Sequence, residues 1–150
     1  MAQADGIHLD TSLGYLLKVT ATALRQAMED ELRPLGMSIT HYSCLELLAQ
    51  RPGLSNSELA RGTFVTRQSM NVLLMSLEEQ GEVARATAAT IGRALPTELT
   101  DRGRERLRRA TAAVRSVELR MLSGLDDGER QQALVLLRKM VGALRDGAEV

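Results

Sequence analysis

The sequence predicts a mostly α-helical protein with one small β-hairpin. Apolar residues recur at helical spacing through most of the chain, whereas aromatic residues make up only 2% of it and only three residues are proline. One stretch, residues 83–99, instead carries two short segments on either side of a tip of small residues. The expected order is a long helix, three shorter helices, the hairpin and two more helices.

The first long helix is predicted over residues 11–33. Apolar residues recur at helical spacing from Leu13 to Leu32, and Pro34 and Gly36 end the pattern. The polar residues 1–10 before it are expected to form a flexible arm. They lack the basic and apolar regions of an export signal, and no apolar stretch of the sequence is long enough to cross a membrane. We therefore expect a cytoplasmic protein without a membrane partner.

Three shorter helices follow, and each begins at a residue whose side chain can accept a hydrogen bond from the helix backbone. The capping residues are Ser38, Ser55 and Thr66. Glu58 stands three residues after Ser55, which is the spacing of a capping box. The helices are expected to end near Arg51, Gly62 and Gly81. The second and third of them are therefore joined by a tight turn.

A hairpin is predicted to follow, with strands over Val83–Thr87 and Ala94–Leu99 and a tip at Ala88–Gly92. Thr100 then opens a long helix. Three helices followed by a hairpin form a winged helix-turn-helix unit, predicted over about residues 38–100. In such a unit the helix after the tight turn is placed to enter a groove of DNA.

The outer helices, about 11–33 and 101–146, carry more apolar surface than a chain of 150 residues can cover. A break at Gly124 separates the long helix from the last one. In the last helix the apolar residues occupy more than one face: Leu134, Leu137, Val141 and Leu144, with Val135, Leu136 and Met140 beside them. We expect these helices to form the interface of a homodimer.

The helix after Thr66 has an outer face whose chemistry suits a major groove. At about 100° per residue, Met70, Leu73, Leu74 and Leu77 fall on one side, and Gln68, Val72, Met75 and Glu79 fall opposite. Apolar atoms can contact thymine methyl groups, arginine pairs with guanine or phosphate, and glutamine and asparagine bind adenine through two hydrogen bonds. Hydroxyls at the helix start can hold phosphates. The predicted DNA-contacting residues are Thr66, Arg67, Gln68, Ser69, Asn71, Val72 and Met75.

Two arginines of the hairpin extend this interpretation. Arg85 and Arg93 bracket the tip, from which a wing can reach the minor groove or its phosphates. Residues 55–110 hold nine arginines and seven acidic residues, so the local excess of positive charge is small although the whole chain is neutral. The arginines at 102, 104, 106, 108 and 109 are expected to form a solvated face with partners such as Asp101 and Glu105.

Two other functions compete with DNA binding. A winged-helix module can instead use Val72 and Met75 to bind a partner protein, with Arg67 and Asn71 as ordinary surface residues. A small enzyme is disfavoured, because no catalytic triad, carboxylate pair or phosphate loop can be picked out. One cysteine and two histidines cannot assemble a zinc site, and with so few aromatic residues the chain lacks a stacking platform for single strands. No catalytic residue, metal or cofactor is predicted.

Several segments in a fixed order resemble the MarR family of bacterial winged-helix transcriptional regulators over nearly the whole chain. The opening of the second helix, Met37–Leu45, is similar to the family pattern, with His41 where glutamine is common. The other matching segments are Pro52–Ser55, Glu58–Ala60, Val65–Met70, Leu77–Gly81 and Leu99–Gly103. The resemblance implies a homodimeric regulator that places two recognition helices in successive major grooves of a near-palindromic operator, with the wings in the flanking minor grooves.

The resemblance also has implications for several individual residues. The family wing has an aspartate two residues before the arginine that matches Arg93, and here Ile91 stands there, which predicts a looser wing. Cys44 matches an apolar core position and is expected to be buried rather than redox-active. Tyr15 and His41 are weak candidates for an effector pocket between the dimer helices and the DNA-binding unit, or are simply packed. We expect a repressor whose effector changes the spacing of the recognition helices.

Overall fold

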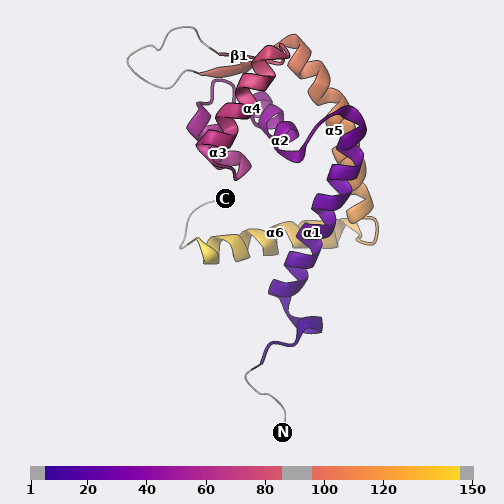
Figure 1. The fold of residues 1–150 in the computed structure, drawn as a ribbon. Coiled ribbons are helices and arrows are strands. Elements are labelled where there is room, and N and C mark those ends of the chain that lie inside the picture. The colour runs from indigo at the N-terminus through magenta and orange to yellow at the C-terminus, as the bar shows by residue number, and fades with distance from the viewer. Residues whose placement is uncertain (1–5, 86–95, 146–150) are drawn as a thin grey trace. The chain divides into compact units, whose positions relative to one another are not determined.

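The computed structural model describes residues 6–85 and 96–145, and they are mostly helical, as predicted (Figure 1). Two compact units divide the chain, Met1–Arg115 and Ser116–Val150, and each is described separately. The helices are α1 (Leu13–Leu32), α2 (Ile39–Gln50), α3 (Asn56–Thr63), α4 (Arg67–Glu79), α5 (Asp101–Met121) and α6 (Asp127–Leu144). The strands are β1 (Val83–Arg85) and β2 (Thr97–Leu99), and two short 3-10 helices are η1 (Leu9–Thr11) and η2 (Arg33–Leu35).

The predicted starts of the three short helices are confirmed. Ser38 accepts a hydrogen bond from the backbone of His41, and Thr66 accepts one from the backbone of Ser69. The capping box of α3 is complete, because Ser55 accepts from the backbone of Glu58 while the Glu58 carboxylate accepts from the backbone of Ser55. Each cap satisfies a backbone donor that the first turn of a helix leaves free.

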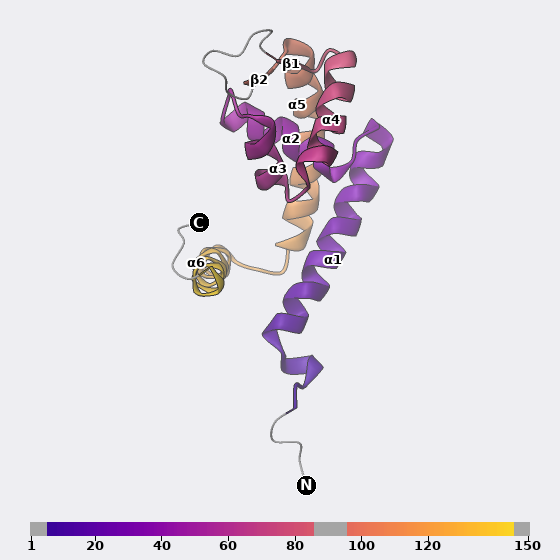
Figure 2. The same ribbon diagram turned by 60° about the vertical axis from the view of Figure 1, so that its left-hand side comes forward.

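The first unit is built on α2, α3 and α4, which lie together beside the two-stranded ribbon (Figure 2). Strands β1 and β2 are antiparallel, with Val83 opposite Leu99, and β2 also pairs with Leu54 through Thr97. The residues of the core share almost complete burial: Leu32, Cys44, Leu45, Leu48, Leu59, Met70, Leu74 and Leu77. This core fixes the orientation of α4 relative to the ribbon, so the inner face of α4 is the one that the sequence predicts.

The first turn of α5 is packed directly on the backbone that precedes β1. A Cβ atom built on Gly103 would lie 2.1 Å from the carbonyl oxygen of Glu82, so only glycine fits there. The same carbonyl accepts a hydrogen bond from the backbone of Thr100, and the Thr100 hydroxyl bonds both to Gly81 and to the backbone of Gly103. The start of α5 and the root of the ribbon are therefore in close contact.

The two outer elements expose apolar side chains. In the first unit, Leu13, Leu16 and Leu17 of α1 are exposed, and only Leu32 of this helix is buried. In the second unit, α6 buries none of its residues, and Leu134, Val135, Leu136 and Leu137 are all exposed. Within residues 6–85 and 96–145, no helix has the length and apolarity that a membrane crossing requires.

Candidate DNA interface

The outer face of α4 carries two exposed apolar side chains in a polar setting. Val72 is 64% exposed and Met75 is 54% exposed, and Gln68 and Glu79 are exposed beside them. The inner face buries Met70, Leu74 and Leu77. Exposed valine and methionine on a polar helix face lose the hydrophobic stabilisation that burial would give them. The division into two faces agrees with the sequence prediction.

Hydroxyl and amide groups gather at the start of α4. Thr66 accepts from the backbone of Ser69 and donates its hydroxyl proton to the Ser69 hydroxyl at 3.0 Å. Asn56, at the start of α3, donates to the backbone carbonyl of Arg67 at 3.5 Å. The Arg67 side chain is exposed at the first position of α4, so the partial positive charge of the helix N-terminus adds to the charge of its guanidinium. This end of α4 is suited to an anion such as a phosphate.

The turn that leads into α4 holds an exposed aromatic residue in a strained conformation. Phe64 has φ +61° and ψ +38°, the left-handed region that glycine normally occupies, and its side chain is 85% exposed. Its backbone N–H bonds to the carbonyl of Arg61, and the N–H of Val65 bonds to the carbonyl of Ala60. Phe64 therefore terminates α3 and sets the tight turn, but its ring contributes little to the core.

Arg85 of β1 is directed toward α4 rather than toward solvent. Its side chain is only 18% exposed, and its Nε atom lies 2.8 Å from Oε1 of Glu78. Its Nη1 atom donates to Oδ1 of Asn71 at 3.4 Å. Glu78 and Asn71 are two turns apart on the same flank of α4. Arg85 therefore connects the ribbon with α4.

A buried carboxylate lies at the root of the ribbon. Glu82, just before β1, is 1% exposed, and its Oε1 atom lies 3.2 Å from Nε2 of His41 and 3.3 Å from Nε of Arg106. Burial lowers the pKa of His41 below its ordinary value, and the attraction of Glu82 opposes this shift only in part. The neutral imidazole therefore donates to the carboxylate, and Arg106 supplies the compensating charge.

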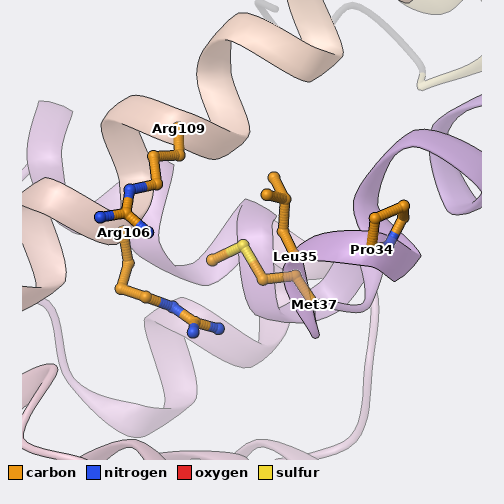
Figure 3. A pocket seen from close by; sticks show the side chains of 5 residues that line it. All are labelled: Pro34, Leu35, Met37, Arg106 and Arg109. Atoms are coloured by element: carbon orange, nitrogen blue, oxygen red, sulfur yellow. The ribbon is translucent and has the colours of Figure 1, made fainter.

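A small cavity adjoins this cluster. It has a volume of about 160 Å³ and is lined by Pro34, Leu35 and Met37 together with Arg106 and Arg109 of α5 (Figure 3). Figure 3 shows the two arginines on one side and the three apolar residues on the other. An anionic group beside an apolar body matches this lining, because guanidinium groups bind carboxylates and the apolar side chains accept a ring.

Neither of the two candidate effector residues, Tyr15 and His41, lines this cavity. Tyr15 lines a shallow hollow along the surface of α1, together with Val19 and Thr22. His41 is 7% exposed and is engaged by Glu82, so it lies beside the cavity rather than in its lining. Arg93 and Ile91 lie outside the described residues. Cys44 is buried, as expected, and burial raises the pKa of its thiol to about 12, which keeps it protonated and unreactive.

Sequence reasoning missed the acidic partners of this region. The two residues are Glu78 and Glu82. Glu78 follows Asn71 by seven residues, a spacing that places both on one flank of a helix and could have identified it. Of the arginines expected on a solvated face, Arg108 and Arg109 do pair with Glu105, whereas Arg106 instead reaches Glu82. A charged residue before an apolar strand gives no sign of its burial in a single sequence.

Comparison with known proteins agrees with this geometry. Residues 35–94 match the MarR family. The chain is 42% identical over 135 residues to the HTH-type transcriptional repressor Rv2887 of Mycobacterium tuberculosis, which covers 90% of this chain and 97% of that relative. The solved structure of Rv2887 in complex with DNA has a TM-score of 0.73 and 40% identity, covering 87% of this chain and 98% of that chain.

Two further solved structures have the same fold. The complex of Rv2887 with salicylic acid has a TM-score of 0.72 and 41% identity, covering 91% of this chain and 98% of that chain. A MarR-family regulator from Silicibacter pomeroyi has a TM-score of 0.81 and 26% identity, covering 91% of this chain and 92% of that one. The order of helices and strands and the two faces of α4 match the winged-helix fold, and the 42% sequence identity extends over 90% of the chain. The protein belongs to the MarR family of winged-helix transcriptional regulators.

Proposed function

We propose that this protein is a cytoplasmic transcriptional repressor that binds double-stranded operator DNA through α4 and acts by binding rather than by catalysis. The observation that carries the proposal is the outer face of α4, where Val72 and Met75 are exposed beside polar groups that can bond to base edges. The repressor Rv2887, which is 40% identical in the compared structure, has been solved in complex with DNA. Thr66, Arg67, Gln68 and Ser69 complete the proposed contact surface.

The proposed operator-binding form is a homodimer. The winged helix of about residues 38–100 contacts DNA, and the helices of about 11–33 and 101–146 form the dimer interface. The exposed leucines of α1 and the wholly unburied α6 support this division, because each presents an apolar face to solvent in a single chain. Two α4 helices about 34 Å apart would meet successive major grooves on one side of the duplex.

We propose that a small aromatic carboxylate releases the operator. The cavity beside Arg106 and Arg109 offers guanidinium groups next to Pro34, Leu35 and Met37, and the relative Rv2887 has been solved with salicylic acid. A titration of the protein–operator complex with salicylate tests this proposal, with Arg109→Gln as the variant and Arg115→Gln as the control on the same helix. Release that is weaker in Arg109→Gln alone supports the site, whereas equal release in both variants places the effector elsewhere.

The DNA-binding proposal is tested by fluorescence anisotropy against the DNA upstream of the protein's own gene and against duplexes selected from a random library, with a salt titration. Arg67→Ala should cost about 1–3 kcal/mol of specific binding. Arg25→Ala removes an arginine of α1 and is the matched control. Failure of the wild-type protein to prefer any duplex over a scrambled one would contradict the proposal.

The alternative is a winged-helix module that binds a partner protein through the exposed apolar residues of α4. It predicts that Val72→Asp abolishes function while Arg67→Ala and Asn71→Ala leave it intact. Operator binding predicts that the two polar variants lose affinity as well. Measuring all three variants against the selected duplex therefore separates the two functions.

A further inference from the structure

The side chain of Asn71 is held from the protein side by Arg85. The guanidinium of Arg85 donates from Nη1 to Oδ1 of Asn71 at 3.4 Å, and its Nε lies 2.8 Å from Oε1 of Glu78. Arg85 is thus fixed at two points on α4, one of them charged, and its burial limits alternative rotamers. The group beside the Asn71 amide is therefore a guanidinium held in one position.

The chemistry of Arg85 determines which end of the amide it binds. A guanidinium has five N–H donors and no acceptor, so it can bind the oxygen of Asn71 but not the nitrogen. The amide nitrogen is left toward Met75, with Nδ2 lying 3.9 Å from Sδ. A thioether sulfur is a weak acceptor, so this contact yields readily to a better one. The amide nitrogen of Asn71, a hydrogen-bond donor, is therefore the group that can bind another molecule.

We propose that Arg85 is a positioning residue that makes Asn71 a one-sided hydrogen-bond donor toward the major groove. This inference rests on the proposed DNA-binding function and refines it. Bidentate binding of adenine needs the amide oxygen to accept from the adenine amino group. The oxygen has a second lone pair, but its bond to Arg85 holds it toward β1, so the two-bond contact with adenine would require this bond to be given up. As held, Asn71 offers its N–H groups to an acceptor: N7 of guanine or adenine, O6 of guanine, or O4 of thymine. The two-bond contact with adenine that the sequence predicts is replaced by a donor contact.

The test compares base preferences rather than affinity alone. Wild-type protein and Arg85→Met are measured against a panel in which each position of the selected operator is changed in turn. In the wild type, one position in each half-site should disfavour cytosine, which presents only a donor, roughly ten-fold, and should not favour adenine over guanine. Arg85→Met frees the amide to rotate, so this preference should fall at that position alone. Arg85→Lys keeps a donor near Oδ1 and should restore part of the preference.

A double variant distinguishes positioning from a direct contact. If Arg85 acts through Asn71, then Arg85→Met combined with Asn71→Ala should have the same base preferences as Asn71→Ala alone. A uniform loss of affinity with unchanged preferences, or additive losses in the double variant, would overturn the inference. Thermal unfolding checks that each variant is folded, and the Arg85→Lys comparison still applies if Arg85→Met is not. Absence of specific binding by the wild type would instead refute the underlying function.

Discussion

The Nε atom of Arg106 lies 3.3 Å from the Oε1 atom of Glu82, in the most buried carboxylate cluster of the described residues. His41 approaches the same oxygen from α2 at 3.2 Å. One carboxylate at the root of the ribbon therefore joins the second helix, the strand and α5. Arg106 also lines the cavity, so the partner of Glu82 is one of the groups that the proposed effector would contact.

Removal of the carboxylate should destabilise the fold. Glu82→Ala leaves the buried imidazole of His41 without its acceptor and Arg106 without its counter-ion, which is expected to lower the free energy of unfolding by about 1–3 kcal/mol. Glu98→Ala, at an exposed position of β2, is the matched control and should change it by less than about 0.5 kcal/mol. Urea unfolding measures both, and equal effects would contradict a structural role for the cluster.

Stability should depend on pH through His41. Its pKa is lowered by burial, so below about pH 6.5 the unfolded chain binds a proton that the folded chain does not. The contribution of neutral His41 is therefore complete above about pH 6.5 and is lost as the pH falls through the lowered pKa. Unfolding measured from about pH 7.5 to 5 should show a shallower decline in His41→Gln than in the wild type. His8→Gln, at an exposed position, should follow the wild-type curve.

Replacing Phe64 should relieve strain in the turn before α4. Glycine adopts φ +61° without the steric cost that a side chain incurs, and the exposed phenyl ring gives up little packing. Phe64→Gly is expected to raise the free energy of unfolding by up to about 1 kcal/mol. Phe64→Ala, which shortens the side chain but keeps the Cβ atom, should not. A loss of stability in Phe64→Gly would show that the ring has a packing role.

The dimer is tested by placing a charge on the exposed apolar surface of α6. Leu137→Asp should shift the protein from dimer to monomer in sedimentation equilibrium at micromolar concentration, because an unpaired carboxylate in an apolar interface is costly. Gln131→Asp adds the same charge at an exposed polar position of this helix and should leave the dimer intact. A fully dimeric Leu137→Asp, or a monomeric wild type, would refute the assignment of this surface.

Local signals predicted the helical part of the fold well. Ser38, Ser55 and Thr66 cap their helices as expected, since a cap depends only on residues within one turn. The two faces of α4 also follow from spacing alone, because Met70 and Leu74 repeat with the helical period. Signals confined to a few neighbouring residues are therefore sufficient for most of the elements.

A single sequence does not predict which residues far apart in the chain will pair. Glu82 and His41 are separated by 41 positions, and only the packing of α2 against the ribbon brings them together. The sequence predicts that Arg85 belongs to the wing beside the hairpin tip, whereas in the fold its guanidinium contacts Glu78 and Asn71 of α4. The spacing of apolar residues does not show which charged side chains are buried, nor with which residue a charged side chain pairs.

The contact of Gly103 with the carbonyl of Glu82 has a mechanical consequence. There is no room between the helix and the strand root for even one methyl group, and two hydrogen bonds from Thr100 close the joint. The start of α5 cannot slide or roll against the ribbon without pushing it. Any movement of the first turn of α5 toward the ribbon must therefore displace the backbone of Glu82 with it.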